Sequence, residues 1–417
     1  SKSFAGTKIK IGVQNVRAIG NPAKTHAVSW EKRTGGTAEV IQSDFGHLFV
    51  NYMASLKAAE PSYDVLLFPS AWAADFFPYL TELPIELRDS EAFDDIHPIY
   101  RDRLMTWDGK WIAATVDGDL FSGYYRKDLF EDPRNQADFR ARYGYELFPP
   151  DTWRQYHDIA EFFTKRRSGD GSRVYGTAEA FARNGQQFWT LFSRASSYTN
   201  HPEHPGAQFF DPYTMRAQVN NPGWLRAVQE YKEILKFSPP GAKNFGIVEA
   251  RNAFLNGHTA MALDWGDTAQ ISADTKHSKI SGKVGFFLLP GSKNVWNSKF
   301  WQWTSMKSVH KAPFLAFGGW IAGVPKNSRN PDAAWDYIMW FSSPENSLRD
   351  VVTSGTGINP YRFTHFTNID VWTEALVEES FRPRVASIAS PRRVSSASRP
   401  SSLRSVASSV RVTESKI

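Results

Sequence analysis

The sequence predicts an α/β fold built as two lobes, and three observations lead to this prediction. The chain has 417 residues, which exceeds what one hydrophobic core usually organises. Short apolar runs that suit buried strands alternate with longer stretches of helical periodicity. No run of about 18 apolar residues occurs, so no segment suits a membrane-spanning helix. We therefore expect two packed units, each with strands and helices.

The N-terminal residues show the first strand, helix and strand of this pattern. Residues 8–14 (KIKIGVQ) alternate between polar and apolar side chains, which predicts a strand. Apolar residues then recur at helical spacing from Phe45 to Leu56, with Asp44 as the candidate N-cap. Residues 64–68 (DVLLF) form an apolar run that stops at Pro69, as a buried parallel strand does. A strand, a helix and a second strand begin an α/β layer.

The later elements continue the same alternation. After a turn at 107–110, a strand is predicted over 111–116, and Asp117-Gly118-Asp119 interrupts it. Thr152 and Gln155 have capping-box spacing at the start of a helix. The further expected elements are a helix over 247–256, strands over 261–263, 284–289 and 320–324, and a helix over 331–341.

The two ends of the chain differ from its body. Residues 1–10 lack the pattern of a signal peptide and enter a strand almost at once, so we expect an already processed or trimmed chain. From Phe381 onward, seven Arg and one Lys against one Glu give a local charge of +7, among 11 Ser. Residues 381–417 are therefore predicted to form a flexible tail. Residues 1–380 carry a net charge of about −1, which favours neither nucleic acid nor an acidic membrane.

The composition also limits the chemistry. Cysteine is absent, which excludes thiolate catalysis, Cys-ligated zinc and disulfides. No Gly-rich phosphate-binding motif occurs where a strand leads into a helix. The ten His residues are scattered, and His201 with His204 have no obvious third ligand, so we expect neither a metal nor another cofactor. The 15 Trp residues suit a ligand cleft, although most Trp side chains in proteins simply pack.

A series of short segments follows one another from residue 8 to residue 362. They are Tyr63-Asp64-Val65-Leu66 with Trp72, Trp107-Asp108-Gly109-Lys110, Asp117-Gly118-Asp119, Tyr125-Arg126-Lys127-Asp128-Leu129-Phe130, Pro150-Asp151-Thr152-Trp153, Phe254-Leu255-Asn256-Gly257-His258-Thr259-Ala260-Met261, Leu289-Pro290-Gly291, Gly318-Gly319-Trp320, Pro325-Lys326-Asn327-Ser328 and residues 331–340. In this order and spacing the chain resembles the family 1 extracellular solute-binding proteins of bacterial ABC importers, which include maltose- and other sugar-binding proteins.

This resemblance implies a two-lobed periplasmic binding protein fold of type II, in which hinge strands join the lobes and the ligand binds between them. The first lobe is expected to contain residues 1–114 and 291–342, and the second residues 118–287 and 346–380. The hinge crossings are expected at 115–117, 288–290 and 343–345. The family usually continues with several helices, whereas this chain offers only 369–380 before its tail. A truncation or an altered reading frame near Phe381 is our hypothesis for this difference.

An uncharged sugar needs aromatic surfaces for its CH groups and polar side chains for its hydroxyls, placed beyond the carboxyl ends of strands. The resemblance implies an acidic hydroxyl acceptor at Asp119, and Asp117 is a second candidate; the alternative is a pair of turn or hinge carboxylates. Trp265 and Asp267 follow the strand predicted at 261–263 and are candidates for the same reason.

Other aromatic and polar residues are further candidates. Trp72, with Ser70 beside it, follows the strand at 64–68 and either stacks on the ligand or packs on its lobe. Trp320 has the same two interpretations. The remaining candidate contacts are Asn15, Trp189, Asn359 and Arg362. A cluster of Trp296, Trp301 and Trp303 either roofs the cleft or belongs to a loop that packs on itself.

The predicted function is the solute-binding component of an ABC importer, which closes on a carbohydrate or polyol and delivers it to a membrane permease. We expect a monomer without catalytic activity or a nucleic-acid partner, in the periplasm or as a lipoprotein on a Gram-positive cell surface. The alternative is a glycoside hydrolase that uses Asp117 and Asp119, about 7 Å apart on one side of an extended strand. Nothing in the sequence indicates a raised pKa for either carboxyl. A third hypothesis makes the tail a nucleic-acid or partner-binding arm, although it lacks interleaved aromatic residues.

Overall fold

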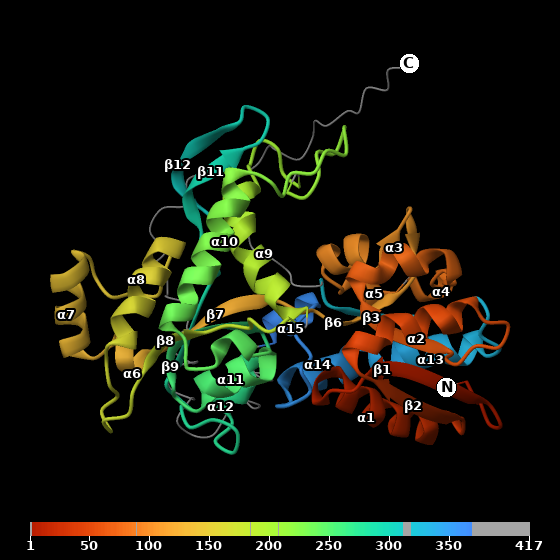
Figure 1. Cartoon of the computed structure of the whole chain (residues 1–417). Helices are drawn as coiled ribbons and strands as arrows, with labels where there is room; N and C mark the ends of the chain where they lie inside the picture. The colour runs from red at the N-terminus through yellow and green to blue at the C-terminus, as the bar shows by residue number, and fades with distance from the viewer. Residues whose placement is uncertain (1, 89, 184, 207, 312–317, 369–417) are drawn as a thin grey trace, which may run out of the picture. The chain divides into compact units, whose positions relative to one another are not determined.

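Two mixed β-sheets organise the chain, and each has its own hydrophobic core. The computed structural model describes residues 2–88, 90–183, 185–206, 208–311 and 318–368. In Figure 1, the first sheet and its helices are red, orange and blue, and the second sheet and its helices run from yellow to cyan. The tail expected at 381–417 and the segment at 369–380 lie outside the described residues.

The first sheet has five strands in the order β2-β1-β3-β13-β6. β1 is parallel to β2 and β3, whereas β13 is antiparallel to β3 and β6. The strands cover Thr37–Ser43 (β2), Lys8–Gln14 (β1), Val65–Pro69 (β3), Trp320–Gly323 (β13) and Ala114–Asp117 (β6). Every side chain of β3, β6 and β13 is buried, as in strands covered on both faces.

The helices and other short elements that accompany this sheet begin with α1, whose first residues are irregular. Ala18 and Ile19 have non-helical backbone angles, so the regular part of α1 begins after Ile19. The elements are α1 (Arg17–Thr34), α2 (Phe45–Lys57), η1 (Ser70–Trp72), α3 (Ala73–Phe76), η2 (Phe77–Tyr79), α4 (Ile85–Arg88), α5 (Glu91–Asp94), η3 (Tyr100–Leu104), β4 (Thr106–Trp107), β5 (Lys110–Trp111), α13 (Pro331–Phe341), α14 (Pro344–Val352) and α15 (Phe363–Thr367).

The second sheet has four strands in the order β10-β7-β9-β8. β9 is parallel to β8 and antiparallel to β7, and β10 is antiparallel to β7. The strands cover Val284–Phe287 (β10), Phe121–Arg126 (β7), Thr259–Trp265 (β9) and Tyr175–Ala178 (β8). The helices are α6 (Lys127–Phe130), α7 (Pro133–Tyr143), α8 (Trp153–Thr164), α9 (Gln186–Thr199), α10 (Pro222–Ile234), η4 (Leu235–Phe237), η5 (Ala242–Asn244), α11 (Ile247–Leu255) and α12 (Thr268–Ala273).

Several local predictions are confirmed and others need correction. The capping box of Thr152 and Gln155 is present at the start of α8. α2 begins at Phe45 as predicted, but the Asp44 side chain caps no backbone N–H and instead accepts a 3.5 Å hydrogen bond from Asn15. The strand predicted over 111–116 is divided into β5 and β6, and the strand predicted at 261–263 extends to Trp265.

A two-stranded hairpin corrects the expected position of one crossing. It consists of β11 (Ser292–Asn297) and β12 (Gln302–His310), and β11 packs against α9 and α10, the helices of the second core. Gly223 of α10 approaches so closely that a Cβ there would lie 3.1 Å from the Cβ of Trp296. The chain therefore does not enter the first lobe at residue 291, and residues 288–290 do not change sheets.

The second correction concerns residues 346–362, which were expected in the second lobe. Val351, Ile358 and Tyr361 belong to the hydrophobic core of the first sheet. His26 of α1 and Asp350 of α14 are both buried, and Nε2 of the histidine lies 2.6 Å from Oδ2 of the aspartate. Residues 343–345 therefore do not leave the first core.

The described part of the chain contains no helix that is both long enough and apolar enough to cross a membrane.

Candidate functional site

A cavity of about 130 Å³ collects residues from both sheets. Its lining includes Gln14, Val16, Ala18, Ile19, Asp117, Asp119, Gln186, Ile247, Val248, Arg251, Trp265, Asp267, Trp320 and Gly357. A neighbouring cavity of about 280 Å³ shares five of these residues and adds Arg17, Asn252, Ile271, Asp274, His277, Ser354 and Gly355. The two cavities therefore adjoin and share part of their walls, and together they are the candidate ligand site.

Asp117 and Asp119 stand on the link between the two sheets, because β6 ends at Asp117 and β7 begins at Phe121. Both carboxyl groups are buried. Gly118 between them has no room for a side chain, since a Cβ would lie 2.2 Å from the carbonyl oxygen of Pro360. Gly319, with a φ of 90°, is as tightly packed, because its Cβ would lie 2.0 Å from the carbonyl oxygen of Asp117. Backbone packing thus fixes both carboxyl groups at the cavity wall.

Asn359 joins these two carboxyl groups. Its side-chain nitrogen donates hydrogen bonds to Oδ1 of Asp117 at 3.3 Å and to Oδ1 of Asp119 at 3.1 Å. Its backbone N–H donates to the same Asp117 oxygen at 2.7 Å. Asn359 was predicted as a ligand contact, but the structure places it behind the two carboxyls, outside the lining of the cavity. It orients the acceptors that face the cavity.

Burial raises the pKa of both carboxyl groups. The pKa of Asp117 rises to about 8, because desolvation outweighs the hydrogen bonds from Asn359 and the charge of Asp267 adds to the rise. Desolvation, followed by the charges of Asp117 and Asp267, raises the pKa of Asp119 well above its ordinary value. The sequence offered no sign of these shifts, since they come from tertiary burial.

Arg251 is the cationic residue that lines both cavities. Its guanidinium donates two hydrogen bonds of 2.8 Å to Asp267 and bonds of 2.8 and 3.0 Å to Asp264. Desolvation raises the pKa of Asp267, and the charge of Arg251 opposes that rise. Asp264 in turn accepts hydrogen bonds from the backbone of Trp265 and the hydroxyl of Thr268. Arg251 therefore joins α11, on which it lies, to Asp264 of β9 and to Asp267 in the cavity lining.

Two indole rings complete the site. Trp265, at the end of β9, lies edge to face with Phe121 at 5.3 Å and donates a 3.2 Å hydrogen bond from Nε1 to Gln186. Trp320 opens β13 on the first sheet and lies edge to face with Phe45 at 6.4 Å. Both rings are buried and line the cavity. Aromatic faces, carboxyl acceptors and a guanidinium are the groups that a polyhydroxylated ligand needs.

The structure brings together five of the predicted site residues in the lining of the cavity, namely Asp117, Asp119, Trp265, Asp267 and Trp320. Arg251, Gln186 and Gln14 line it as well but were not predicted. Gln14 is the last residue of β1 and directly precedes the predicted Asn15. The expectation that ligands bind beyond the carboxyl ends of strands therefore selected the residue after the one that lines the cavity. Arg251 and Gln186 lie on helices, and an expectation about strand ends does not select helical residues.

The other predicted residues lie outside this lining. Asn15 is exposed and bonds to Asp44, and Ser70 donates its backbone N–H to Gly319 at 3.2 Å. Trp72 packs against Phe45 and Phe49 at 5.5 and 5.3 Å, which favours its packing interpretation.

Trp189 and Arg362 also lie elsewhere. Trp189 contacts Phe188 on α9, at 5.2 Å between ring centres. Arg362 is 1% exposed and donates hydrogen bonds to the carbonyl oxygens of Ala92 and Ser342, so its guanidinium holds the backbone together.

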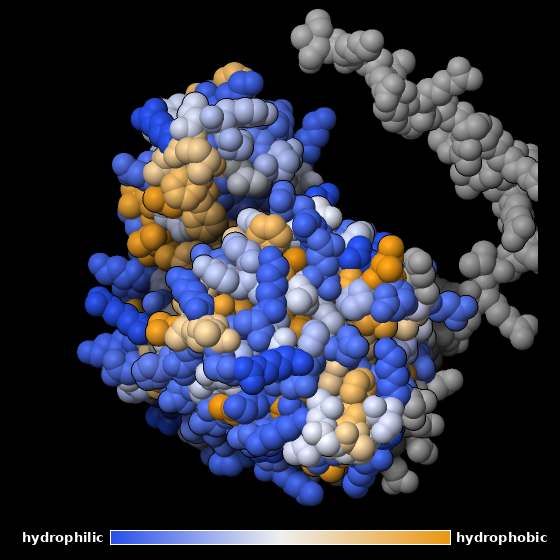
Figure 2. All heavy atoms as spheres, turned by 90° about the vertical axis from the view of Figure 1, so that its right-hand side faces the viewer, coloured by the Kyte–Doolittle hydropathy of each residue, from blue (hydrophilic) through white to orange (hydrophobic). Residues whose placement is uncertain are grey.

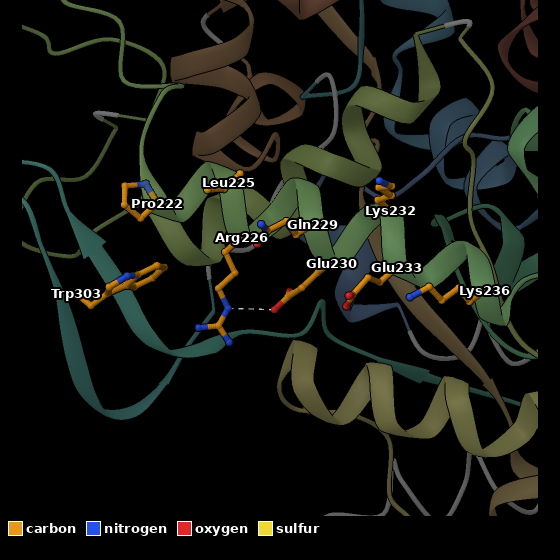
Figure 3. A pocket seen from close by; sticks show the side chains of 9 residues that line it. All are labelled: Pro222, Leu225, Arg226, Gln229, Glu230, Lys232, Glu233, Lys236 and Trp303. Carbon is orange, nitrogen blue, oxygen red and sulfur yellow. Dashed lines mark hydrogen bonds and ion pairs between the residues drawn. The ribbon is translucent and has the colours of Figure 1, made fainter.

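The cluster of Trp296, Trp301 and Trp303 belongs to the β11–β12 hairpin and lines neither cavity. Trp303 instead lines an open groove of about 870 Å³ beside α10 (Figure 3). The structure thus agrees with a segment that packs on itself and on the second core. Within the described ranges, no three His, Asp or Glu side chains converge as a metal site would require.

Comparisons with known proteins agree on one family. A family model of bacterial extracellular solute-binding proteins matches residues 27–373. A probable ABC transporter-binding protein of Deinococcus radiodurans is 24% identical over 351 residues, which cover 84% of this chain and 74% of that protein. A mannitol-binding protein of Pseudomonas aeruginosa is 25% identical over 253 residues, which cover 60% of this chain and 49% of that protein. The chain thus matches about half the length of the second relative.

The fold has close counterparts among solved structures. One is an ABC transporter solute-binding protein from Agrobacterium radiobacter in complex with ribitol, with a TM-score of 0.71 and 21% identity. The match covers 92% of this chain and 87% of that chain. At this identity the likeness concerns the fold, which is two-lobed and α/β.

Proposed function

The chain belongs to the family of bacterial extracellular solute-binding proteins and has its two-lobed α/β fold, and we propose that it binds a carbohydrate or polyol and delivers it to the permease of an ABC importer. The observation that carries this proposal is the convergence of Asp119, Arg251 and Trp265 with Trp320 of the other sheet on one cavity. Neutral hydroxyl groups pair with both the carboxyl oxygens and the guanidinium, and CH faces pack on the indole rings.

The size of the site supports a small ligand. Small-molecule sites usually have volumes of about 300–1,000 Å³. The two adjoining cavities, of about 130 and 280 Å³, together reach the lower end of that range. A monosaccharide or a linear polyol therefore fits this site better than a long oligosaccharide. The matched proteins that bind mannitol and ribitol support the same ligand class.

Closure of the two lobes around the ligand is the proposed mechanism. The ligand contacts groups of both lobes at once, so it binds the closed form more tightly and shifts the population toward it. Asp117-Gly118-Asp119 is the proposed first hinge, because it joins the sheets directly. Residues 288–290 are not a second crossing in this proposal, since β11 and β12 pack on the second core and the next described strand, β13, belongs to the first sheet.

A glycoside hydrolase is the competing function, and the raised pKa values of Asp117 and Asp119 are the observation in its favour. A hydrolase needs one protonated and one ionised carboxyl in separate environments. Here one amide, that of Asn359, donates to both groups, and burial raises both pKa values. This arrangement suits hydroxyl acceptors better, so we propose binding without turnover. Release of reducing sugar by catalytic amounts of the protein would overturn this part of the proposal.

The family also implies a place of action outside the cytoplasm. We propose the periplasm, or the cell surface as a lipoprotein, with a monomer that docks on its permease after closure. Neither nucleic acid nor a cofactor has a role in this proposal.

A thermal-shift screen tests the proposed ligand class. The panel contains hexitols, pentitols, monosaccharides, disaccharides and glycerol phosphates, because a ligand that binds only the folded state raises the melting temperature. We expect the largest rise with a polyol or monosaccharide. A rise with amino acids or peptides alone, added as the control panel, would contradict the proposal.

A further inference from the structure

The β11–β12 hairpin presents aromatic side chains at its tip. Phe300 and Trp301 lie in the turn between the strands and expose 60% and 58% of their surface. Trp296 is buried and meets Trp301 and Trp303 edge to face at 5.5 and 5.6 Å. The buried ring thus anchors the hairpin and supports the exposed rings, which remain available to a partner.

The backbone at the tip has a conformation that the residue type does not favour. Trp301 has a φ of 55°, in the left-handed region that Gly and Asn adopt more readily. Since the ring is more than half exposed, core packing does not account for a bulky side chain there. Such an outlier indicates a role for the side chain itself.

The hairpin is also basic. Lys293, Lys299 and Lys307 are exposed, and residues 292–310 contain no Asp or Glu. The ammonium group of Lys299 lies 5.5 Å from the centre of the Phe300 ring. Lys299 therefore shares the tip with the two exposed rings, while Lys293 and Lys307 lie on the strands near the other end of the hairpin.

The surface near the hairpin contains more exposed apolar residues. Phe210, Tyr213 and Met215, between α9 and α10, are 52%, 94% and 67% exposed. Their segment approaches the hairpin where His201 lies 3.5 Å from Asn297. Figure 1 shows the hairpin and this segment at the top of the view, and Figure 2 shows apolar side chains gathered on the upper part of its face.

The groove beside the hairpin differs from the tip. In Figure 3, Trp303 faces α10, where Arg226 is paired with Glu230 at 3.1 Å. Lys232, Glu233 and Lys236 also line the groove, so its charge is mixed. A surface of mixed charge does not favour an anionic partner. The tip does favour one, because its charged residue is Lys299 and the hairpin contains no Asp or Glu.

We propose that the hairpin tip is a membrane-contact site, which inserts Phe300 and Trp301 into the interface of an anionic bilayer. Trp and Phe rings prefer the level of the lipid headgroups, and Lys299 beside them adds attraction to anionic lipids. The solute site has carboxyl groups beside its indole rings, whereas residues 292–310 contain no Asp or Glu. The contact would hold the protein near its permease, and it is independent of the solute site.

Vesicle binding by the full chain tests this proposal. The vesicles contain phosphatidylcholine alone or mixed with phosphatidylglycerol, and a matched set has brominated acyl chains that quench Trp rings inside the bilayer. We expect sedimentation with the anionic vesicles and quenching by the brominated lipid. Phe300→Ser/Trp301→Asn should weaken vesicle binding at least about tenfold and remove the quenching. Asn at position 301 keeps the left-handed conformation accessible.

Two controls match these changes. Phe148 is 65% exposed and lies outside the hairpin, so Phe148→Ser removes an equally exposed aromatic ring. Lys24 and Lys299 are both exposed, so Lys24→Glu is the control for Lys299→Glu, which should weaken binding to anionic vesicles alone. Unchanged circular dichroism and melting temperature show that the variants fold.

The basic residues at 381–417 provide a second source of attraction to anionic vesicles, and quenching separates the two sources. Loss of quenching in the tip variant, with Phe148→Ser unchanged, supports the proposal. Vesicle binding without quenching, or equal binding by the tip variant, overturns it and assigns the attraction to the basic residues. Absence of vesicle binding overturns it as well; if the tip variant also fails to stimulate ATP hydrolysis by the transporter, the tip is a protein-docking site.

Discussion

Arg251 holds Asp267 through two hydrogen bonds of 2.8 Å, one from each terminal nitrogen of its guanidinium. The same side chain, which lines the cavity, also holds the buried Asp264, so one cation serves two carboxylates. Within the described residues, Asp117 and Asp119 form no ion pair with Lys or Arg, and Asn359 donates to both. The site therefore has an ion-paired side at Asp267 and a side at Asp117 and Asp119 where an amide is the donor, and burial raises the carboxyl pKa on both sides.

The first prediction concerns Arg251→Lys. Lysine keeps the charge but cannot form the paired hydrogen bonds of a guanidinium, so Asp267 loses its fixed orientation. We expect at least about tenfold weaker ligand affinity in calorimetry and a lower melting temperature. Arg349→Lys, at an exposed pair with Glu345, is the matched control and should change neither value. Equal affinities of Arg251→Lys and the unchanged protein would place the ligand elsewhere.

The second prediction concerns the pH dependence of stability. The folded pKa of Asp117, about 8, lies above the ordinary value of 3.8, so the folded state binds a proton more tightly than the unfolded state. The contribution of this proton to the unfolding free energy is fully present at pH values below the ordinary pKa. It is lost as the pH rises toward 8. The unfolding free energy should therefore fall between pH 4 and pH 8, by at least about 1 kcal/mol from this group.

Asp117→Asn is the variant that checks this slope. Asparagine keeps an oxygen acceptor for the backbone N–H of Asn359 but does not titrate. Urea unfolding at several pH values should show a flatter profile for Asp117→Asn than for the unchanged protein. Identical slopes would mean that Asp117 titrates alike in the folded and unfolded states.

The third prediction concerns the hinge glycine. Gly118→Ala places a Cβ 2.2 Å from the carbonyl oxygen of Pro360, so the backbone between the two carboxyls must move. We expect a loss of about 2 kcal/mol or more in unfolding free energy and weaker ligand binding. Gly169→Ala is the matched control, because a Cβ there meets nothing within 4 Å. Equal stability of the two variants would contradict the tight packing described for Gly118.

The fourth prediction separates Arg362 from the ligand site. Arg362→Ala leaves the carbonyl groups of Ala92 and the buried Ser342 without this donor, which should cost about 2 kcal/mol or more. The affinity of the folded variant for its ligand should stay within about twofold, because the guanidinium lies outside the cavity lining. A large loss of affinity with unchanged stability would restore Arg362 as a ligand contact.

The sequence predicted those features of the site that depend on local pattern. Trp265 and Asp267 were predicted because a buried strand ends there, and the structure places both in the cavity. The capping box of Thr152 and Gln155 is equally local and is confirmed. The two-lobed α/β fold followed from the order of many short segments, each of which carries little information alone.

The sequence did not predict features that arise from contacts between distant elements. Arg251 lies on α11 and finds its partners on and beyond β9, a pairing that no spacing rule indicates. Asn359 looked like a polar ligand contact, yet tertiary packing turns its amide toward two carboxyls from another part of the chain. Trp72 and the hairpin at 292–310 were placed by aromatic partners that the sequence does not specify.

Calorimetric titration of the best ligand from the thermal-shift screen into the unchanged protein, Asp119→Ala and Trp265→Ala tests the central claim most directly. We expect the unchanged protein to bind in the micromolar range, about −8 kcal/mol, and both folded variants to bind at least about tenfold more weakly. Unchanged affinity in both variants would contradict the claim that the solute binds in the cavity between the two sheets.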